Sequence, residues 1–231
     1  MCPCRFPLAA PTLFAVMLAA CTSSPPASRQ TAPDLLDLAT LAPDVKLEMR
    51  YATEDNFVGA VVDGYHARRC LLSRPAATAL AALQAELREF GFSLVMYDCY
   101  RPQRAVDHFV RWARDPADQK TKDRYYPHED KATLFERGYI AQRSGHSRAS
   151  TVDLGLLDGH GTPLDTGTRW DYLDPLSATA NPAIEPAARA NRLLLRALMD
   201  KYGFTNYDKE WWHFTLRDEP YPDSYFDFEI L

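Results

Sequence analysis

The sequence predicts an α+β fold, and two observations lead to this prediction. Stretches with the apolar spacing of a helix and stretches with that of a strand follow one another at uneven intervals along the 231 residues. Such a mixture favours an α+β fold over a regularly alternating, doubly wound α/β fold. The chain also contains neither a phosphate-binding loop nor a dinucleotide-binding fingerprint.

Four segments have the composition of strands. Residues 45–51 alternate between apolar and polar side chains, as a half-buried strand does, and residues 92–98 form an apolar, aromatic run of strand length. Residues 151–156 and 211–216 follow, and the last segment is strongly aromatic and β-branched. We expect these four segments in the sheet.

Three segments have the spacing of helices. Residues 74–90 are amphipathic, carry a proline at their second position and are followed by glycine. A second helix is expected from residue 102 to the residues before 115, because residue 115 precedes a proline and such a residue disfavours the helical conformation. The third is expected at residues 186–202, again ended by a glycine.

The N-terminal segment differs from the rest in composition. Residues 1–20 contain one basic residue, a largely apolar stretch and small residues at the end, which predicts a signal peptide. Cys21 follows directly, as the lipidated cysteine of a bacterial lipobox does. Residues 21–33 are therefore expected to form a lipidated cysteine and a flexible tether, because the residues after Cys21 are polar and proline-rich. We expect a periplasmic protein attached to the membrane only through this lipid; an ordinary signal peptide with a chance cysteine is the alternative.

Residues 34–231 have the length of one domain. Without the signal peptide, which holds one of the 26 basic residues and no acid, the chain carries 25 basic and 31 acidic side chains, a formal charge of −6. This charge gives no indication of nucleic acid or an anionic membrane surface as a partner. The domain contains only Cys70 and Cys99, which could pair in an oxidising compartment. Because two thiols cannot form a CxxC-type zinc site, any metal must bind histidine and carboxylate.

A polar loop and the strand that follows it contain two candidate metal ligands. His146 lies in the loop, and Asp153 lies on the strand, on the face opposite to three apolar side chains. An acid in this position could point into a pocket. Taken alone, however, the segment is better explained by a solvent-facing acid and an ordinary loop histidine, because short motifs often match by chance.

A later segment, Glu210-Trp-Trp-His213, supplies a third possible ligand. Two histidines and a carboxylate leave zinc an open position for water, and a nearby glutamate can take the proton of that water and pass it to the leaving amine. Glu210 and His213 would point to opposite faces of a regular strand, so Glu210 must lie in a loop or bulge before it. A core strand with two buried tryptophans is the alternative.

Arg101 follows the strand at residues 92–98, where a side chain can reach a pocket at the end of the sheet. A guanidinium in such a pocket could stabilise the oxyanion that forms when water attacks a peptide carbonyl. A surface salt bridge to Asp98 or Asp107 is the alternative.

Taken together, these motifs resemble the D-alanyl-D-alanine dipeptidases of the vancomycin-resistance type, within the zinc DD-peptidase and hedgehog-domain superfamily. The resemblance covers nearly all of the chain after the tether. It rests on Ser-x-His with an acid seven residues after the histidine (Ser144, His146, Asp153), on Glu-x-x-His (Glu210, His213), on Tyr-Asp-x-Tyr-Arg-Pro at residues 97–102, and on residues 50–57, 169–171 and 191–195. Several motifs in the right order are far more specific than any one of them.

The resemblance implies a central, mainly antiparallel sheet flanked by helices, and hydrolysis of a small substrate, the D-alanyl-D-alanine dipeptide, to two D-alanines. It also implies the roles of individual residues: one Zn²⁺ per chain on His146, Asp153 and His213, Glu210 as general base and then acid, Arg101 on the oxyanion, and Tyr51, Ser144 and Asp171 as substrate contacts. The family usually has Gly and Ala where this chain has Ala149 and Thr151. If the backbone φ at residue 149 is positive, Ala149 is strained by roughly 1 kcal/mol.

Two other functions stay open. A D,D-carboxypeptidase that trims peptidoglycan stem peptides would need an open groove for a longer chain. A non-catalytic, zinc-containing cell-wall binding module would need neither Glu210 nor Arg101, which argues against it. The sequence leaves open the oligomeric state, and whether the role is antibiotic resistance or D-alanine recycling.

Overall fold

The computed structural model describes Met1 and residues 33–231. The proposed cleavage site, Cys21 and nearly all of the tether lie outside the described residues. No helix in residues 33–231 has the length and apolar character needed to cross a membrane.

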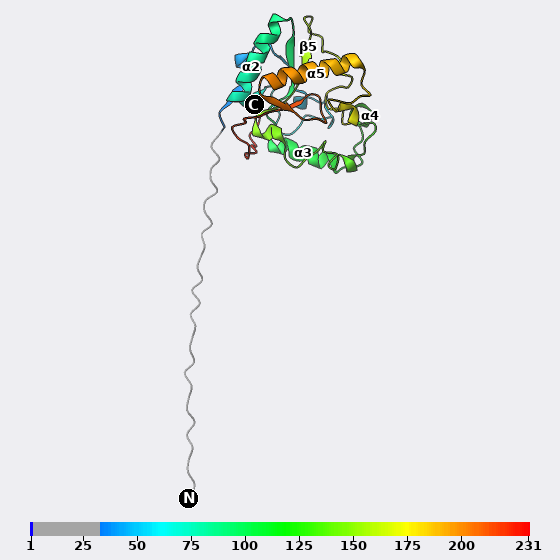
Figure 1. The fold of residues 1–231 in the computed structure, drawn as a ribbon. Helices are drawn as coiled ribbons and strands as arrows, with labels where there is room; N and C mark the ends of the chain where they lie inside the picture. Colours follow the sequence, from blue (N-terminus) through cyan, green and yellow to red (C-terminus); the bar gives the residue numbers. More distant parts are fainter. Residues whose placement is uncertain (2–32) are drawn as a thin grey trace. The chain divides into compact units, whose positions relative to one another are not determined.

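A five-stranded sheet forms the centre of the described domain (Figure 1). Its strands are, in spatial order, β2 (Lys46–Leu47), β4 (Ser93–Asp98), β5 (Thr151–Leu157), β7 (His213–Leu216) and β6 (Phe204–Asn206). Only β2 and β4 run parallel, and the other neighbours are antiparallel. The expected α+β fold with a mainly antiparallel sheet is therefore confirmed.

A smaller antiparallel sheet pairs β1 (Leu35–Asp37) with β3 (Leu71–Ser73). Neither strand was expected from the sequence, and β6 was not expected either. Each has only three residues, which is too short for an alternating pattern to be recognised.

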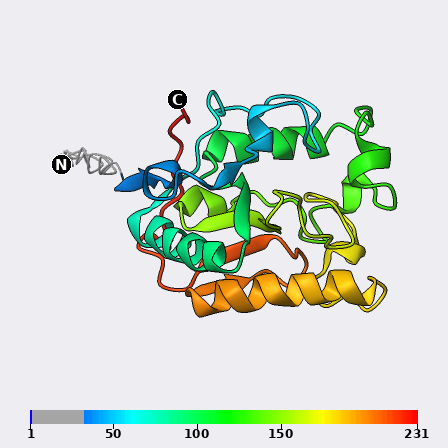
Figure 2. The same ribbon diagram turned by 90° about the horizontal axis from the view of Figure 1, so that it is seen from above.

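Helices lie on both sides of the central sheet, with α5 and α3 on opposite sides (Figure 2). The long helices are α2 (Arg74–Glu89), α3 (Gln103–Ala113) and α5 (Pro186–Lys201), and the short ones are α1 (Leu38–Leu41) and α4 (Lys122–Tyr125). The three long helices confirm the three predicted segments to within two residues at each end. Gly91 and Gly203, which follow α2 and α5, have φ of 74° and 90°, values that glycine adopts at low cost.

Two predicted strands are shorter in the structure. The strand expected at residues 45–51 ends at Leu47, and Arg50–Ala52 form a 3₁₀ turn instead. The turn carries the Tyr51 side chain into a cluster of aromatic rings, where it is only 1% exposed. Burial of this large ring outweighs the strand preference of the local sequence.

The strand expected at residues 211–216 begins only at His213. The residues before it form a turn, in which the amide of Glu210 donates to the carbonyl of Tyr207 and the amide of His213 lies 3.4 Å from the carbonyl of Glu210. Glu210 therefore precedes the strand, as its predicted role requires.

Candidate active site

The three candidate metal ligands are brought together by the pairing of β5 with β7. Asp153 of β5 and His213 of β7 are direct partners in the register of this antiparallel pair. His146 lies in a 3₁₀ turn, Gly145–Arg148, just before β5, and the Ser144 hydroxyl accepts a hydrogen bond from the amide of His146 at 3.3 Å. Sheet register and one short turn thus bring residues from two distant segments to the same point.

The donor atoms of these side chains have the spacing of a metal site. Asp153 Oδ1 lies 3.2 Å from His146 Nε2 and 3.1 Å from His213 Nδ1, and the two nitrogens are 3.3 Å apart. Three ligands around a tetrahedral zinc ion, with bonds of about 2.0–2.1 Å, lie about 3.3 Å from one another. The group could therefore hold a metal ion without moving its donor atoms.

The chemistry of the three donors also fits a cation. Asp153 Oδ1 is buried and has no hydrogen-bond partner among the described residues. Burial raises the pKa of Asp153, but the neighbouring imidazoles outweigh this effect and hold the pKa well below its usual value, so the carboxylate is ionised. Burial lowers the pKa of His213, which favours the neutral imidazole that a metal requires. An ionised carboxylate oxygen without a proton donor is costly to bury unless a cation lies beside it.

Glu210 lies next to this group without belonging to it. Its Oε2 atom is 3.6 Å from His213 Nδ1, and its side chain lines the same pocket. Burial raises the pKa of Glu210 well above its usual value, and the charges of Asp153 and Asp171 raise it further. A carboxylate with a raised pKa readily accepts a proton, as a general base must.

Arg101 is buried in the wall of the pocket and paired with an acid. Its Nε and Nη2 atoms each lie 2.8 Å from Oδ2 of Asp98, and its Nη2 atom lies 3.5 Å from Oδ2 of Asp153. The alternative from the sequence was a salt bridge at the surface. The pairing with Asp98 exists, but the arginine side chain is only 11% exposed and the aspartate is completely buried. Within residues 33–231, the one hydrogen bond of Nη1 is a long contact of 3.4 Å with the Ser144 hydroxyl.

The pocket has a volume of about 300 Å³ and contains all but one of the residues predicted for catalysis, metal binding and substrate contact. Those that line it are Tyr51, Arg101, Ser144, Asp153, Asp171, Glu210 and His213; His146 lies behind them, fully buried. Aromatic and aliphatic side chains complete the wall, among them Phe57, Phe109, Ile140 and Leu173. Such a volume is at the small end for ligand pockets and suits a small molecule.

Two predicted substrate contacts touch each other. The Tyr51 hydroxyl donates a hydrogen bond of 2.7 Å to Oδ2 of Asp171. Burial raises the pKa of Asp171 well above its usual value, and the charge of Asp153 raises it further. Asp171 has a φ of 56°, a left-handed conformation that aspartate tolerates better than most residues.

Two further residues support the site: Tyr65, which was not expected from the sequence, and Asp98, which was expected only as a surface partner of Arg101. Asp98 binds Arg101 and accepts a hydrogen bond of 2.6 Å from the Tyr65 hydroxyl. Asp98 belongs to the Tyr-Asp-x-Tyr-Arg-Pro stretch, so this motif was the available signal in the sequence. No motif pointed to Tyr65.

The backbone of Ala149 has a positive φ of 61°, at a position where the family that the sequence resembles usually has glycine. Ala149 is therefore strained, as was expected from the sequence for a positive φ at this position.

The fold and the pocket are those of an enzyme: an α+β domain with a His-Asp-His group, an acid and an arginine around one small cavity. Residues 31–230 match the profile of the M15 peptidase family, described as D-ala-D-ala dipeptidase, and the chain belongs to this family. It is thus a peptidase.

Two relatives that are more than 40% identical to this chain support this assignment. A D-alanyl-D-alanine dipeptidase of Streptomyces coelicolor is 46% identical over 191 residues, which cover 82% of this chain and 95% of the relative. One of Enterococcus faecalis is 44% identical over 188 residues, or 80% of this chain and 93% of the relative. Among solved structures, vancomycin resistance D,D-dipeptidase VanXYg in complex with a D-Ala-D-Ala phosphinate analogue is 18% identical, with a TM-score of 0.36 over 80% of this chain and 67% of that one.

Proposed function

We propose that the protein is a zinc-dependent dipeptidase that hydrolyses D-alanyl-D-alanine to two D-alanines, with one zinc ion on His146, Asp153 and His213. The observation that carries the proposal is the spacing of the three donor atoms, 3.1–3.3 Å, around a carboxylate oxygen that has no hydrogen-bond partner among residues 33–231. The substrate is proposed from the printed names of the relatives.

Each remaining group in the pocket has a proposed task. A zinc ion held by His146, Asp153 and His213 would supply a Lewis acid that polarises the peptide carbonyl and makes bound water more acidic. Glu210 takes the proton from the attacking water and then passes it to the amine of the leaving D-alanine. Arg101 faces the developing oxyanion, and its Nη1 is the guanidinium nitrogen with the weakest existing contact.

The substrate's ammonium group is proposed to bind Asp171. This carboxyl group is buried, and its only hydrogen bond from a described side chain comes from Tyr51. A charged amine would favour the ionised carboxylate and form a charge-assisted hydrogen bond with it. Ser144, which also lines the pocket, is proposed as a further contact with the dipeptide.

The direct experiment measures release of D-alanine from D-alanyl-D-alanine by the purified protein, with a chelator and after addition of zinc. We expect release that stops with the chelator and returns with the metal. Activity that persists in fully metal-free protein would refute the zinc proposal. Metal binding without any release of D-alanine would favour the non-catalytic binding module.

We further propose that residues 1–20 are removed as a signal peptide, that Cys21 is lipidated and that residues 21–33 tether a periplasmic catalytic domain of residues 34–231. The support is the sequence pattern, a small-residue site directly before a cysteine. Intact-mass analysis of protein extracted from membranes should show a diacylated or triacylated N-terminus at Cys21. An unmodified N-terminus at another residue would overturn the proposal.

A further inference from the structure

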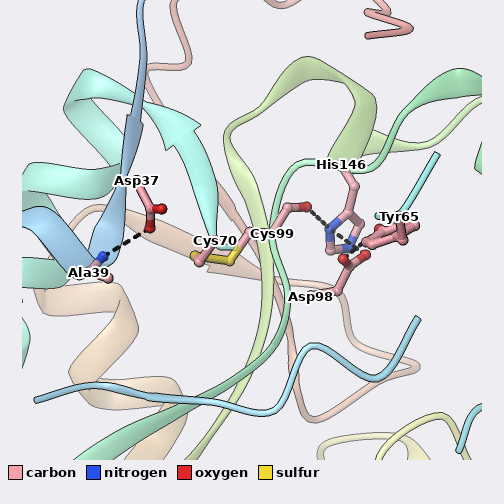
Figure 3. The surroundings of a disulfide bond; sticks show 7 residues. All are labelled: Asp37, Ala39, Tyr65, Cys70, Asp98, Cys99 and His146. Carbon is pink, nitrogen blue, oxygen red and sulfur yellow. Dashed lines mark hydrogen bonds and ion pairs between the residues drawn. A yellow bond between two sulfur atoms is a disulfide. The ribbon is translucent and has the colours of Figure 1, made fainter. Parts of the chain in front are cut away.

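The disulfide between Cys70 and Cys99 lies directly beside the candidate metal centre (Figure 3). The Cys99 carbonyl oxygen accepts a hydrogen bond of 2.7 Å from Nδ1 of His146. Because a carbonyl can only accept, Nδ1 carries the proton and Nε2 is the nitrogen left for a metal. The position of the Cys99 carbonyl therefore sets the orientation of the His146 ring.

No other acceptor near His146 Nδ1 is free to take over this task in the described part of the chain. Oδ2 of Asp98 lies 3.4 Å from Nδ1, but it already accepts a hydrogen bond of 2.8 Å from Nε of Arg101 and forms an ion pair of 2.8 Å with Nη2 of the same guanidinium. The other oxygen of Asp98 accepts from the Tyr65 hydroxyl. If the Cys99 carbonyl moved, His146 would lose its orienting partner.

The backbone at Cys99 is held by more than the central sheet. The regular pairing of β4 with β5 shifts register between Met96 and Asp98, and Cys99 follows the last residue of β4. Next to Cys99, the amide of Tyr100 donates to the carbonyl of Leu71 on β3. The disulfide is the covalent part of this connection, since Cys70 directly precedes β3.

The β3 strand is in turn tied to the segment that follows His146. The amide of Ser73 donates to the carbonyl of Ala149 at 2.6 Å, and the hydroxyl groups of Ser73 and Ser150 are 2.7 Å apart. The amide of Arg101 also donates to the carbonyl of His146. Residues 70–73, 98–101 and 146–150 thus form one connected unit, and the disulfide joins two of its three segments.

We propose that the Cys70–Cys99 disulfide is a positioning element of the metal centre, which fixes the carbonyl that orients His146 and so raises the affinity for the metal. The inference rests on the proposed role of His146 as a zinc ligand. It means that the site reaches its full affinity only after the two thiols have lost two electrons and two protons to an oxidant of the thiol–disulfide exchange type. Export to an oxidising compartment would then complete the metal site.

The test compares the zinc affinity of the parent with that of Cys70→Ala/Cys99→Ala, by competition with a chelating dye. Loss of a partner that orients a metal ligand typically weakens metal binding by about 10- to 100-fold, and this is the range that we expect. The matched control is Leu195→Ala, a fully buried position on α5 that does not line the pocket. This control should also lose stability, since it leaves a cavity in the core just as the cysteine variant loses a cross-link, yet it should keep its zinc affinity within about twofold of the parent.

Three results would overturn the inference. Unchanged affinity in the cysteine variant, or equal weakening in both variants, would reduce the disulfide to a contributor to overall stability. In both cases the parent still binds zinc, so the proposed function stands. A parent that binds no zinc would remove the proposed function and this inference with it.

A measurement on the unmodified protein covers the case in which the cysteine variant does not fold. In the zinc-loaded parent, the Nδ1 proton of His146 should give a slowly exchanging signal in nuclear magnetic resonance spectra, because the Cys99 carbonyl holds it inside a fully buried site. Rapid exchange of this proton with solvent would show that the carbonyl does not fix the ring, and would overturn the inference without any substitution.

Discussion

Nδ1 of His213 lies 3.1 Å from Oδ1 of Asp153, and the two residues are direct partners across the β5–β7 pair. Because strand register sets this distance, the two donors are positioned before any metal arrives. His146 adds the third donor from the turn before β5. A site built in this way should bind metal with little rearrangement of the fold.

Zinc should therefore stabilise the folded protein. At a free concentration of 100 times the dissociation constant, binding to the folded state alone adds about 2.7 kcal/mol to the free energy of unfolding. His213→Ala should abolish most of this zinc-induced stabilisation, because only two of the three protein ligands remain to hold the ion. Thermal unfolding with and without zinc measures both values. An equal zinc-induced rise in Tm for parent and variant would show that the ion binds elsewhere.

Glu210→Gln should separate metal binding from catalysis. The amide keeps the size of the side chain but cannot accept the proton, so we expect kcat to fall by about two to four powers of ten. Zinc content should remain at one per chain, since Glu210 is not among the three grouped donors. Metal analysis and turnover on the same preparation give the result. A variant that retains more than half of the parental kcat would exclude Glu210 as the base.

Arg101→Ala should lower kcat by about two to three powers of ten, the usual loss when an oxyanion donor is removed. The substitution also leaves the buried Asp98 without its cation, so loss of structure must be separated from loss of chemistry. Adding guanidinium ions to the folded variant provides this control, since a small cation can occupy the vacated space. Partial recovery of kcat supports the role, and unchanged turnover in the uncomplemented variant contradicts it.

The regular elements were largely predictable from the sequence, because their signals are local. The spacing of apolar residues in α2 and α5 and the glycine after each helix are visible in any window of the chain. The early end of the strand at Leu47 was not predictable, since it depends on the burial of Tyr51 against rings from four other segments. Local preference carries no information on such contacts.

The candidate site also has some features that were predictable from the sequence and others that were not. Glu210 could be placed before its strand from side-chain alternation together with the hypothesis that it shares a site with His213, and in the structure it precedes the strand. The pairing of Asp153 with His213 depends on register between segments 60 residues apart, and only family resemblance suggested it. The support that His146 receives from the Cys99 carbonyl is a backbone contact, which leaves no signal in side-chain identity.

Arg192 should be essential for the loop that carries Asp171. Its guanidinium is fully buried and donates to the carbonyls of Thr166, Leu176 and Ala178, at 2.7–2.9 Å. Arg192→Met would leave the carbonyls of Thr166 and Leu176 without a donor from the described part of the chain, whereas the carbonyl of Ala178 still accepts from the amide of Asn181. At about 1–3 kcal/mol for each buried unpaired group we expect a loss of roughly 2 kcal/mol or more. Arg196→Met, an exposed position on the same helix, should change stability by no more than about 0.5 kcal/mol. Equal urea denaturation midpoints for the two variants would contradict the prediction.

The last prediction concerns the length of the substrate. A free dipeptide carries an ammonium group that can bind Asp171, whereas an N-acetylated or N-terminally extended peptide does not. Without the ammonium group the buried carboxyl loses a partner, which costs about 1–3 kcal/mol or one to two powers of ten in kcat/KM. Further discrimination must be steric, and Tyr51 and Phe57, both buried in the wall of the 300 Å³ pocket, are placed to provide it.

The measurement compares kcat/KM for D-alanyl-D-alanine, its N-acetyl form and a stem pentapeptide that ends in D-alanyl-D-alanine. We expect kcat/KM to be highest for the dipeptide, lower for the acetyl dipeptide and lowest for the pentapeptide. In Asp171→Asn the ratio of kcat/KM between the dipeptide and its acetyl form should fall, because the charge that recognises the amine is gone. In Phe57→Ala the ratio between the acetyl dipeptide and the pentapeptide should fall, because the substitution opens the pocket wall. Equal rates on all three substrates in the parent would contradict the dipeptidase and favour the D,D-carboxypeptidase, because a pocket that accepts the pentapeptide equally well cannot be closed around a free amine.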